Sequence, residues 1–225
     1  PATWSEALKI AADGLKKAGA NAGFIASGSL TNEEAMAVQS LARDVAGSAN
    51  IDSTVSAYGG GLIAALRAVH GDAGIGIASQ ADLKSADVVV VIGADPSQKK
   101  QTMQEADVMI RRRAQAGAKV IVVSTEKTDL AHHANAILLQ LKAGTDTVLL
   151  AGLMSAALAE GAVPSAKGLD ALKKSLVAVD AAASASGVSG EQITLAAKAY
   201  AAAKNPVVVI GTGISASEEA STQAL

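Results

Sequence analysis

The chain has 225 residues, of which 50% are hydrophobic and 18% are charged, so it carries enough apolar surface to bury a folded core. A formal net charge of −2 and an aromatic content of 2% argue against nucleic-acid binding, which relies on basic patches and aromatic stacking. Cysteine is absent, which excludes disulfides, thiolate nucleophiles and cysteine ligands to zinc or iron–sulfur clusters in this chain. No apolar run reaches the roughly 18 residues of a membrane span, so we expect no direct membrane insertion.

The N-terminal part predicts a helix–strand–helix segment. Apolar residues at helical spacing and a following Gly19 predict a first helix that ends at this glycine. Thr31 and Glu34 have the spacing of a capping box, which predicts the start of the second helix. The expected elements are a helix at Ser5–Ala18, a strand at Ala22–Ala26 and a helix that ends near Val45.

The rest of the chain alternates helical patterns with short apolar runs. Gly, Ser, Thr and Asn predict a loop over 47–61. The following stretch at 71–77 is Gly-rich, and we expect at most a brief strand in it. The expected strands lie at 87–92, 119–123, 137–141 and 206–210. The expected helices lie near 62–69, 103–116, 145–160, 165–187 and 191–203, the last capped by Ser189. Residues 79–85 are expected to form a short helix or a turn.

Continuous Val and Ile strands between helices indicate an α/β fold with a parallel sheet flanked by helices on both faces, Rossmann-like and doubly wound. We expect two parts: an N-terminal αβα segment at 1–48 and a Rossmann-like α/β domain at 49–225. Ligands of such folds bind at the carboxyl ends of the strands. The loops that follow the predicted strands are therefore the first places to look for a site.

Two such loops carry small polar residues. The sequence Gly93-Ala94-Asp95-Pro96 follows the most apolar strand, and its aspartate is suited either to bind a ligand or to cap the next helix. The sequence Gly144-Thr145-Asp146 precedes an apolar helix, and Thr145 or Asp146 is suited to cap that helix or to bind a ligand. The residues alone do not decide between these interpretations.

Three other features are weaker indications of function. Adjacent histidines, His132 and His133, point in different directions on a helix and favour a surface or capping role over metal binding. The run Arg111–Arg113 suits the last turns of a helix and is typical of a solvated face, with anion binding as the alternative. Motifs for phosphate-binding loops and for a serine nucleophile elbow are absent, so the residues by themselves show no catalytic group.

Several segments, taken in order, resemble the molybdopterin oxidoreductase superfamily. Its members include the formate dehydrogenase α subunits and the related large subunit of NADH–quinone oxidoreductase (complex I). The matching segments are Trp4–Leu8, Gly28–Glu34 with Gln39–Arg43, Asn50–Asp52, Ala86–Pro96, Gly117–Val123, Leu141–Asp146 and Gly211–Ile214. The resemblance implies that seven residues occupy pterin-binding positions, retained here as vestiges: Gly93, Asp95, Pro96, Thr128, Gly144, Thr145 and Asp146.

Departures from the family pattern bear on function. Where catalytic members place the metal-ligating Cys or selenocysteine, this chain has Thr54, whose hydroxyl is a poor ligand for a soft metal. Ser56 stands near the place of a usual Arg, and Ala143 replaces a Pro. The family's D-P-R-x-T segment reads Ser124–Thr128, in which Thr128 alone survives. We therefore expect no catalytic residue and no metal ligand in this chain.

The pattern is most similar to the large subunit of complex I, which implies a non-catalytic scaffold without a cofactor of its own. It would be cytoplasmic, held at the inner membrane by the other subunits of a respiratory or redox complex. One alternative is a fragment of a molybdenum or tungsten formate dehydrogenase that carries molybdopterin guanine dinucleotide, with Asp52 or Ser53 near the metal position. Another is the middle domain of a thiamine-diphosphate enzyme, which shares the A-D-V-V-V-V-I-G-A-D-P pattern.

Overall fold

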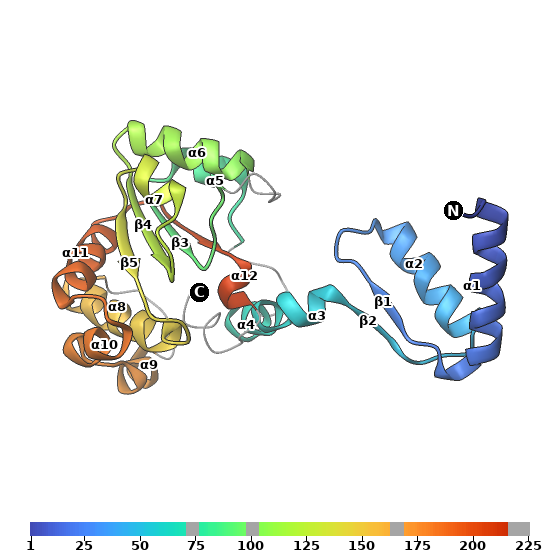
Figure 1. The fold of residues 1–225 in the computed structure, drawn as a ribbon. Coiled ribbons are helices and arrows are strands. Elements are labelled where there is room, and N and C mark those ends of the chain that lie inside the picture. The colour runs from blue at the N-terminus through green and yellow to red at the C-terminus, as the bar shows by residue number, and fades with distance from the viewer. Residues whose placement is uncertain (71–76, 98–103, 163–168, 216–225) are drawn as a thin grey trace. The chain divides into compact units, whose positions relative to one another are not determined.

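The computed structural model describes residues 1–70, 77–97, 104–162 and 169–215 (Figure 1). Contacts divide the chain into two units, Pro1–Gly59 and Gly60–Leu225. The boundary after residue 48 that the sequence predicts stays a prediction. The brief strand expected at 71–77 falls almost wholly outside the described residues.

Unit 1 is a small parallel β-pair with helices. Its elements are α1 (Trp4–Ala18), a 3₁₀ turn η1 (Gly19–Asn21), β1 (Phe24–Ala26), α2 (Asn32–Ser40), a π-helical turn η2 (Leu41–Val45), β2 (Ile51–Ser53) and α3 (Thr54–Tyr58). Phe24 pairs with Ile51 and Ala26 with Ser53 in parallel register. The loop expected over 47–61 is therefore wrong in part, because it contains β2, α3 and the start of α4.

The helix starts of unit 1 follow the sequence closely. Thr31 accepts a hydrogen bond from the Glu34 N–H and the Glu34 carboxylate accepts one from the Thr31 N–H, which confirms the predicted capping box. Apolar burial is sparse by contrast. Within this unit the described buried residues are Ala22, Ala42 and Ser48, and the Ser48 hydroxyl donates to the Ala22 carbonyl at 2.6 Å. This polar contact ties the start of β1 to the segment before β2.

Unit 2 is built on a four-stranded parallel sheet in the order β5-β4-β3-β6. The strands are β3 (Val88–Ile92), β4 (Lys119–Ser124), β5 (Ile137–Gln140) and β6 (Pro206–Ile210). The helices are α4 (Gly60–His70), α5 (Gln80–Ser85), α6 (Gln104–Gln115), α7 (Asp129–His133), α8 (Asp146–Ala159), α9 (Leu169–Ser175), α10 (Val179–Ser186), α11 (Gly190–Ala201) and α12 (Thr212–Ser215). The α/β fold with a parallel sheet and flanking helices is confirmed.

Alternating side chains of the strands divide the core of unit 2 into two layers. On one face Val90, Ile121 and Leu139 pack with α8, α10 and α11, and on the other Val89 and Val122 pack with α5, α6 and α7. Figure 1 shows these two groups of helices on opposite sides of the sheet. All five residues of β3 are buried because this strand has neighbours on both edges and helices on both faces.

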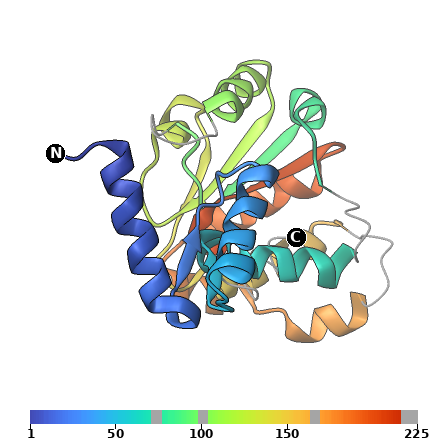
Figure 2. The ribbon, with the colours of Figure 1, turned by 90° about the vertical axis from the view of Figure 1, so that its right-hand side faces the viewer.

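Strand β6 joins the sheet beside β3 although the two lie far apart in the sequence. Their register pairs Val88 with Pro206 and Ile92 with Ile210. In Figure 2, turned by 90° from Figure 1, β6 (red) runs beside the green strand β3. The Asp87 carboxylate strengthens this join, since it accepts hydrogen bonds from the N–H groups of Lys204 (2.7 Å) and Asn205 (2.9 Å).

Candidate functional site

The carboxyl ends of the four strands meet at one edge of the sheet, because every pair in it is parallel. The loops after β5, β4, β3 and β6 therefore follow one another along this edge. All seven residues predicted at pterin-binding positions lie in the loops after β3, β4 and β5 or at the helix start that follows. We call these four loops the carboxyl edge of unit 2.

The loops after β3 and β6 touch through glycine backbone. Gly93 has φ +60°, and its carbonyl oxygen accepts a hydrogen bond of 2.9 Å from the Gly213 N–H. A Cβ on Gly213 would lie 2.8 Å from that oxygen, and a Cβ on Gly211 would overlap Gly93 and Ala94. The sequence predicted Gly93 as a site position but did not show what Gly211 and Gly213 contribute. A glycine pair directly after an apolar strand is the signal for this close approach.

Asp95 is half-buried at the turn after β3. Its Oδ1 accepts hydrogen bonds from both the N–H and the hydroxyl of Ser97, so this carboxylate holds its own loop in shape. Its Oδ2 accepts no hydrogen bond from the described residues and remains available as an acceptor. Pro96 is fully buried, which gives it a packing role in the same turn.

Thr128 is buried after β4, and its role in the structure is local. Its Oγ1 accepts a hydrogen bond of 3.1 Å from the Ala131 N–H and caps α7. The same loop is tied to its neighbour, because the Gln140 side-chain amide donates to the Thr125 carbonyl at 3.2 Å. These contacts stabilise the loops and leave Glu126 and Lys127 exposed.

The loop after β5 leads into helix α8. Gly144 has φ +78° and would have no atom within 4 Å of an added Cβ, so it faces open space. The Thr145 hydroxyl donates to the Lys142 carbonyl at 2.6 Å and makes no capping bond to the helix. The structure therefore excludes a capping bond from Thr145, which is one of the roles that the sequence left open. Asp146, half-buried in the first turn, puts a negative charge where the helix dipole favours one.

Thr54 lies in unit 1, at the first position of α3. Its Oγ1 accepts a hydrogen bond of 3.0 Å from the Gly28 N–H, which ties the loop after β1 to the start of α3. The neighbouring Asp52 accepts hydrogen bonds from the Ser56 hydroxyl (2.6 Å) and the Ser53 N–H (2.7 Å). These two bonds lower the pKa of the Asp52 carboxyl below its ordinary value. Asp52 is therefore an anion held by its own helix start.

Metal-binding side chains do not gather in the part of the chain that the structure describes. His132 and His133 meet edge to face with ring centroids 5.4 Å apart, as adjacent residues at the end of α7. Over the described ranges no group of three or more His, Cys, Asp or Glu side chains is placed to hold a metal ion. The same ranges contain no helix long and apolar enough to cross a membrane.

A family model for molybdopterin oxidoreductases matches residues 1–223, nearly the whole chain. The chain belongs to the molybdopterin oxidoreductase family. It is 26% identical to the F420-dependent formate dehydrogenase subunit alpha of Methanocaldococcus jannaschii, over 94% of this chain and 32% of that protein. It is 28% identical to formate dehydrogenase H of Escherichia coli, over 95% of this chain and 31% of that protein. It therefore spans about a third of the length of these relatives.

A solved structure shares the fold of this chain. Acetylene hydratase from Pelobacter acetylenicus superposes with a TM-score of 0.72 at 22% identity, over 99% of this chain and 32% of the hydratase chain. At that identity the likeness shows a shared fold alone. The relatives support the superfamily and the formate dehydrogenase side of the resemblance, and they give no support for the complex I subunit in particular.

Proposed function

We propose that this chain is the nucleotide-binding α/β part of a molybdenum or tungsten oxidoreductase of the formate dehydrogenase type. The observation that carries the proposal is the family match over residues 1–223, together with the formate dehydrogenase relatives. The carboxyl edge of unit 2 would bind the dinucleotide portion of the pterin cofactor. When bound, such a cofactor supplies two-electron redox chemistry through its metal.

The residues at this edge fit a nucleotide ligand. The free Oδ2 of Asp95 can accept hydrogen bonds from the N–H groups of a guanine base. Because Thr145 makes no capping bond, the first N–H groups of α8 can face a phosphate beside Gly144. The carboxylate of Asp146 in that turn would repel an anion. The phosphates would therefore bind to the backbone N–H groups, away from this carboxylate.

The residues of this chain fit the metal poorly. Thr54 offers a neutral hydroxyl oxygen that already accepts the Gly28 N–H, whereas soft metals select thiolates. We therefore derive no reaction step at the metal from this chain. Thr54 also favours a second candidate, a non-catalytic scaffold like the large subunit of NADH–quinone oxidoreductase, held near the inner membrane by partner subunits.

Partner subunits belong to the proposal in either case. The relatives of Methanocaldococcus jannaschii and Methanococcus maripaludis are named as alpha subunits of formate dehydrogenases. A chain that covers about a third of such a subunit would work within a multisubunit redox complex.

The test is elemental analysis for molybdenum and tungsten on the natively purified parent protein, with pterin fluorescence on the same sample. Stoichiometric metal and pterin, with formate-dependent reduction of a dye, is the expected result. Pterin and metal both absent from an assembly that keeps its redox activity would overturn the first candidate in favour of the scaffold.

A further inference from the structure

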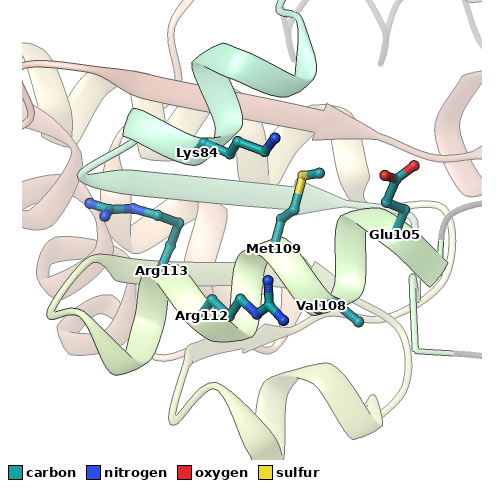
Figure 3. Close-up of a pocket in the computed structure, with 6 residues that line it drawn as sticks. All are labelled: Lys84, Glu105, Val108, Met109, Arg112 and Arg113. Atoms are coloured by element: carbon teal, nitrogen blue, oxygen red, sulfur yellow. The ribbon is translucent and has the colours of Figure 1, made fainter.

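A groove of about 570 Å³ lies between helices α5 and α6 of unit 2 (Figure 3). Six residues line it: Lys84 of α5 and Glu105, Val108, Met109, Arg112 and Arg113 of α6. The five residues of α6 follow the spacing i, i+3, i+4, i+7 and i+8, so they form one continuous helix face. At 1.5 Å per residue this face is about 12 Å long.

The charges of the groove are unbalanced. Three cations face one carboxylate, and that carboxylate, Glu105, already accepts a hydrogen bond of 2.9 Å from the Gln80 side chain. The nearby Asp107 is paired with Arg111 at 2.8 Å. Among the described residues, Lys84 and Arg112 have no ion pair or hydrogen bond from their side chains, and both are exposed.

Arg113 is held in place by the fold. Its Nε donates a hydrogen bond of 2.8 Å to the Ala86 carbonyl, just before β3. The N–H donors of its two terminal guanidinium nitrogens remain available to a ligand. Because this guanidinium is already held in place, it loses less conformational entropy on binding a carboxylate than a freely moving one would. This bond also locates the cationic end of the groove at the amino end of β3. The cationic end of the groove is therefore at the opposite end of the strand from the Gly93 loop.

Apolar side chains occupy the middle of the groove. Val108 is 47% exposed, and Met109 is half-buried against the core layer formed by Leu83, Ile110 and Val89. Figure 3 shows the Met109 side chain reaching from α6 toward α5, between Lys84 and Glu105. The helix dipole accounts for cations in the last turn of α6, but it does not account for an exposed apolar centre beside them.

We propose that the α5–α6 groove docks an acidic amphipathic helix of a partner subunit. The apolar residues of such a helix would pack on Val108 and Met109. Its carboxylates would pair with Lys84, Arg112 and Arg113. This arrangement is the helix-in-groove mode of recognition. A small anion would use the cations and leave the apolar centre without a role. The partner comes from the multisubunit complex proposed above, so this inference rests on that part of the proposed function.

The experiment uses the native assembly, with the photo-crosslinking amino acid benzoylphenylalanine in place of Val108. We expect a crosslink to one segment of another subunit, rich in Asp and Glu and with apolar residues at helical spacing. The double variant Lys84→Glu, Arg112→Glu reverses two charges of the groove and should lower the crosslink yield about tenfold, since charge pairs across an interface set both rate and affinity. The variant Lys173→Glu, Lys174→Glu makes the same change of charge on exposed α9 and should leave the yield unchanged.

Three results would overturn the docking proposal. They are a crosslink confined to this chain, a crosslinked segment without acidic excess, and an equal loss of yield in both double variants. Circular dichroism and thermal melting of the variants identify any loss of fold. Metal and pterin are measured on the same preparation, which separates the two proposals. A crosslink without cofactor contradicts the proposed oxidoreductase function and leaves the docking proposal standing. Cofactor without a crosslink contradicts the docking proposal alone.

Discussion

The N–H of Gly213 donates to the carbonyl oxygen of Gly93 at 2.9 Å, so the last strand of the described sheet closes directly onto the turn after its central strand. The contact is between backbone atoms, which leaves no room for side chains at the junction. The turn that carries Asp95 is thereby anchored by a segment more than a hundred residues later in the sequence.

Replacing Gly211 by Ala should destabilise unit 2. The added Cβ would overlap the Gly93 carbonyl oxygen and the Ala94 side chain and lie 2.7 Å from the Ala94 Cα, so backbone must move. We expect a loss of about 1–3 kcal/mol in the free energy of unfolding, measured by urea denaturation. Gly60→Ala is the control, because its Cβ would meet nothing within 4 Å. Equal stability of the two variants would show that the loops after β3 and β6 have room for a side chain at residue 211.

Helices α8 and α10 approach closely at Gly152. A Cβ there would overlap the Cβ of Ala182, which is fully buried, so Gly152→Ala should cost about 1–3 kcal/mol. Adding Ala182→Gly removes the Cβ that the new side chain at residue 152 would overlap. The double variant should therefore be more stable than the sum of the two single changes predicts. Gly190→Ala, with its nearest contact at 3.5 Å, should be near neutral. Strict additivity in the cycle would argue against this contact.

Stability should fall in acid partly through Asp87. The N–H groups of Lys204 and Asn205 lower the pKa of this carboxyl below its ordinary value. A carboxyl whose pKa is lower in the folded state than in the unfolded state stabilises the fold. Its full contribution is present above the unfolded-state pKa of about 3.9, and it is lost as the pH falls through the folded-state pKa. Asp87→Asn should therefore be less stable than the parent at neutral pH, and the difference should shrink in acid. Asp170→Asn, an exposed change on α9, should follow the parent curve in thermal melts at each pH.

The hydroxyl of Thr54 should protect the Gly28 amide from solvent exchange. Thr54→Val removes the acceptor of the 3.0 Å bond and should lower local stability by about 0.5–1.5 kcal/mol. Thr54→Ser keeps the oxygen and should retain most of the protection. Hydrogen exchange at Gly28 measured by NMR separates the two variants. If both exchange alike, the bond does not hold this loop.

Pterin retention should depend on Asp95 if the carboxyl edge holds the nucleotide. Asp95→Ala removes the free Oδ2 acceptor and should weaken retention about tenfold, the effect of one hydrogen bond between a charged and a neutral group. The measurement is pterin fluorescence per mole of protein after extensive dialysis. Asp170→Ala, on α9, is the control. Full retention in Asp95→Ala would remove this residue from the proposed site.

The sequence predicted the parts of the fold that depend on local patterns. The Val and Ile runs at 88–92 and 120–123 form buried strands as expected, and the caps at Thr31 and Ser189 follow from residue spacing. The strand Ile51–Ser53 and the helix Asp129–His133 were not predicted because they are short, and the strand exists only through its pairing with Phe24–Ala26.

The sequence predicted which loops carry the candidate site residues, but it did not predict the contacts that these loops make. Parallel strands bring their carboxyl ends together, which placed Gly93, Asp95 and Asp146 at one edge. The bond from Thr145 to the Lys142 carbonyl and the meeting of Gly93 with Gly213 depend on tertiary geometry, which no local pattern contains.

Strand β6 is synthesised long after its partner β3, which has a consequence for folding during translation. Strand β3 is complete at Ile92, but its second neighbour is not made until Pro206–Ile210 leaves the ribosome. Until then one edge of an entirely apolar central strand lacks its partner, a situation that favours mispairing with other chains. A nascent chain should therefore need chaperones most between these two points, and truncation before Pro206 should yield aggregates, not a smaller folded domain.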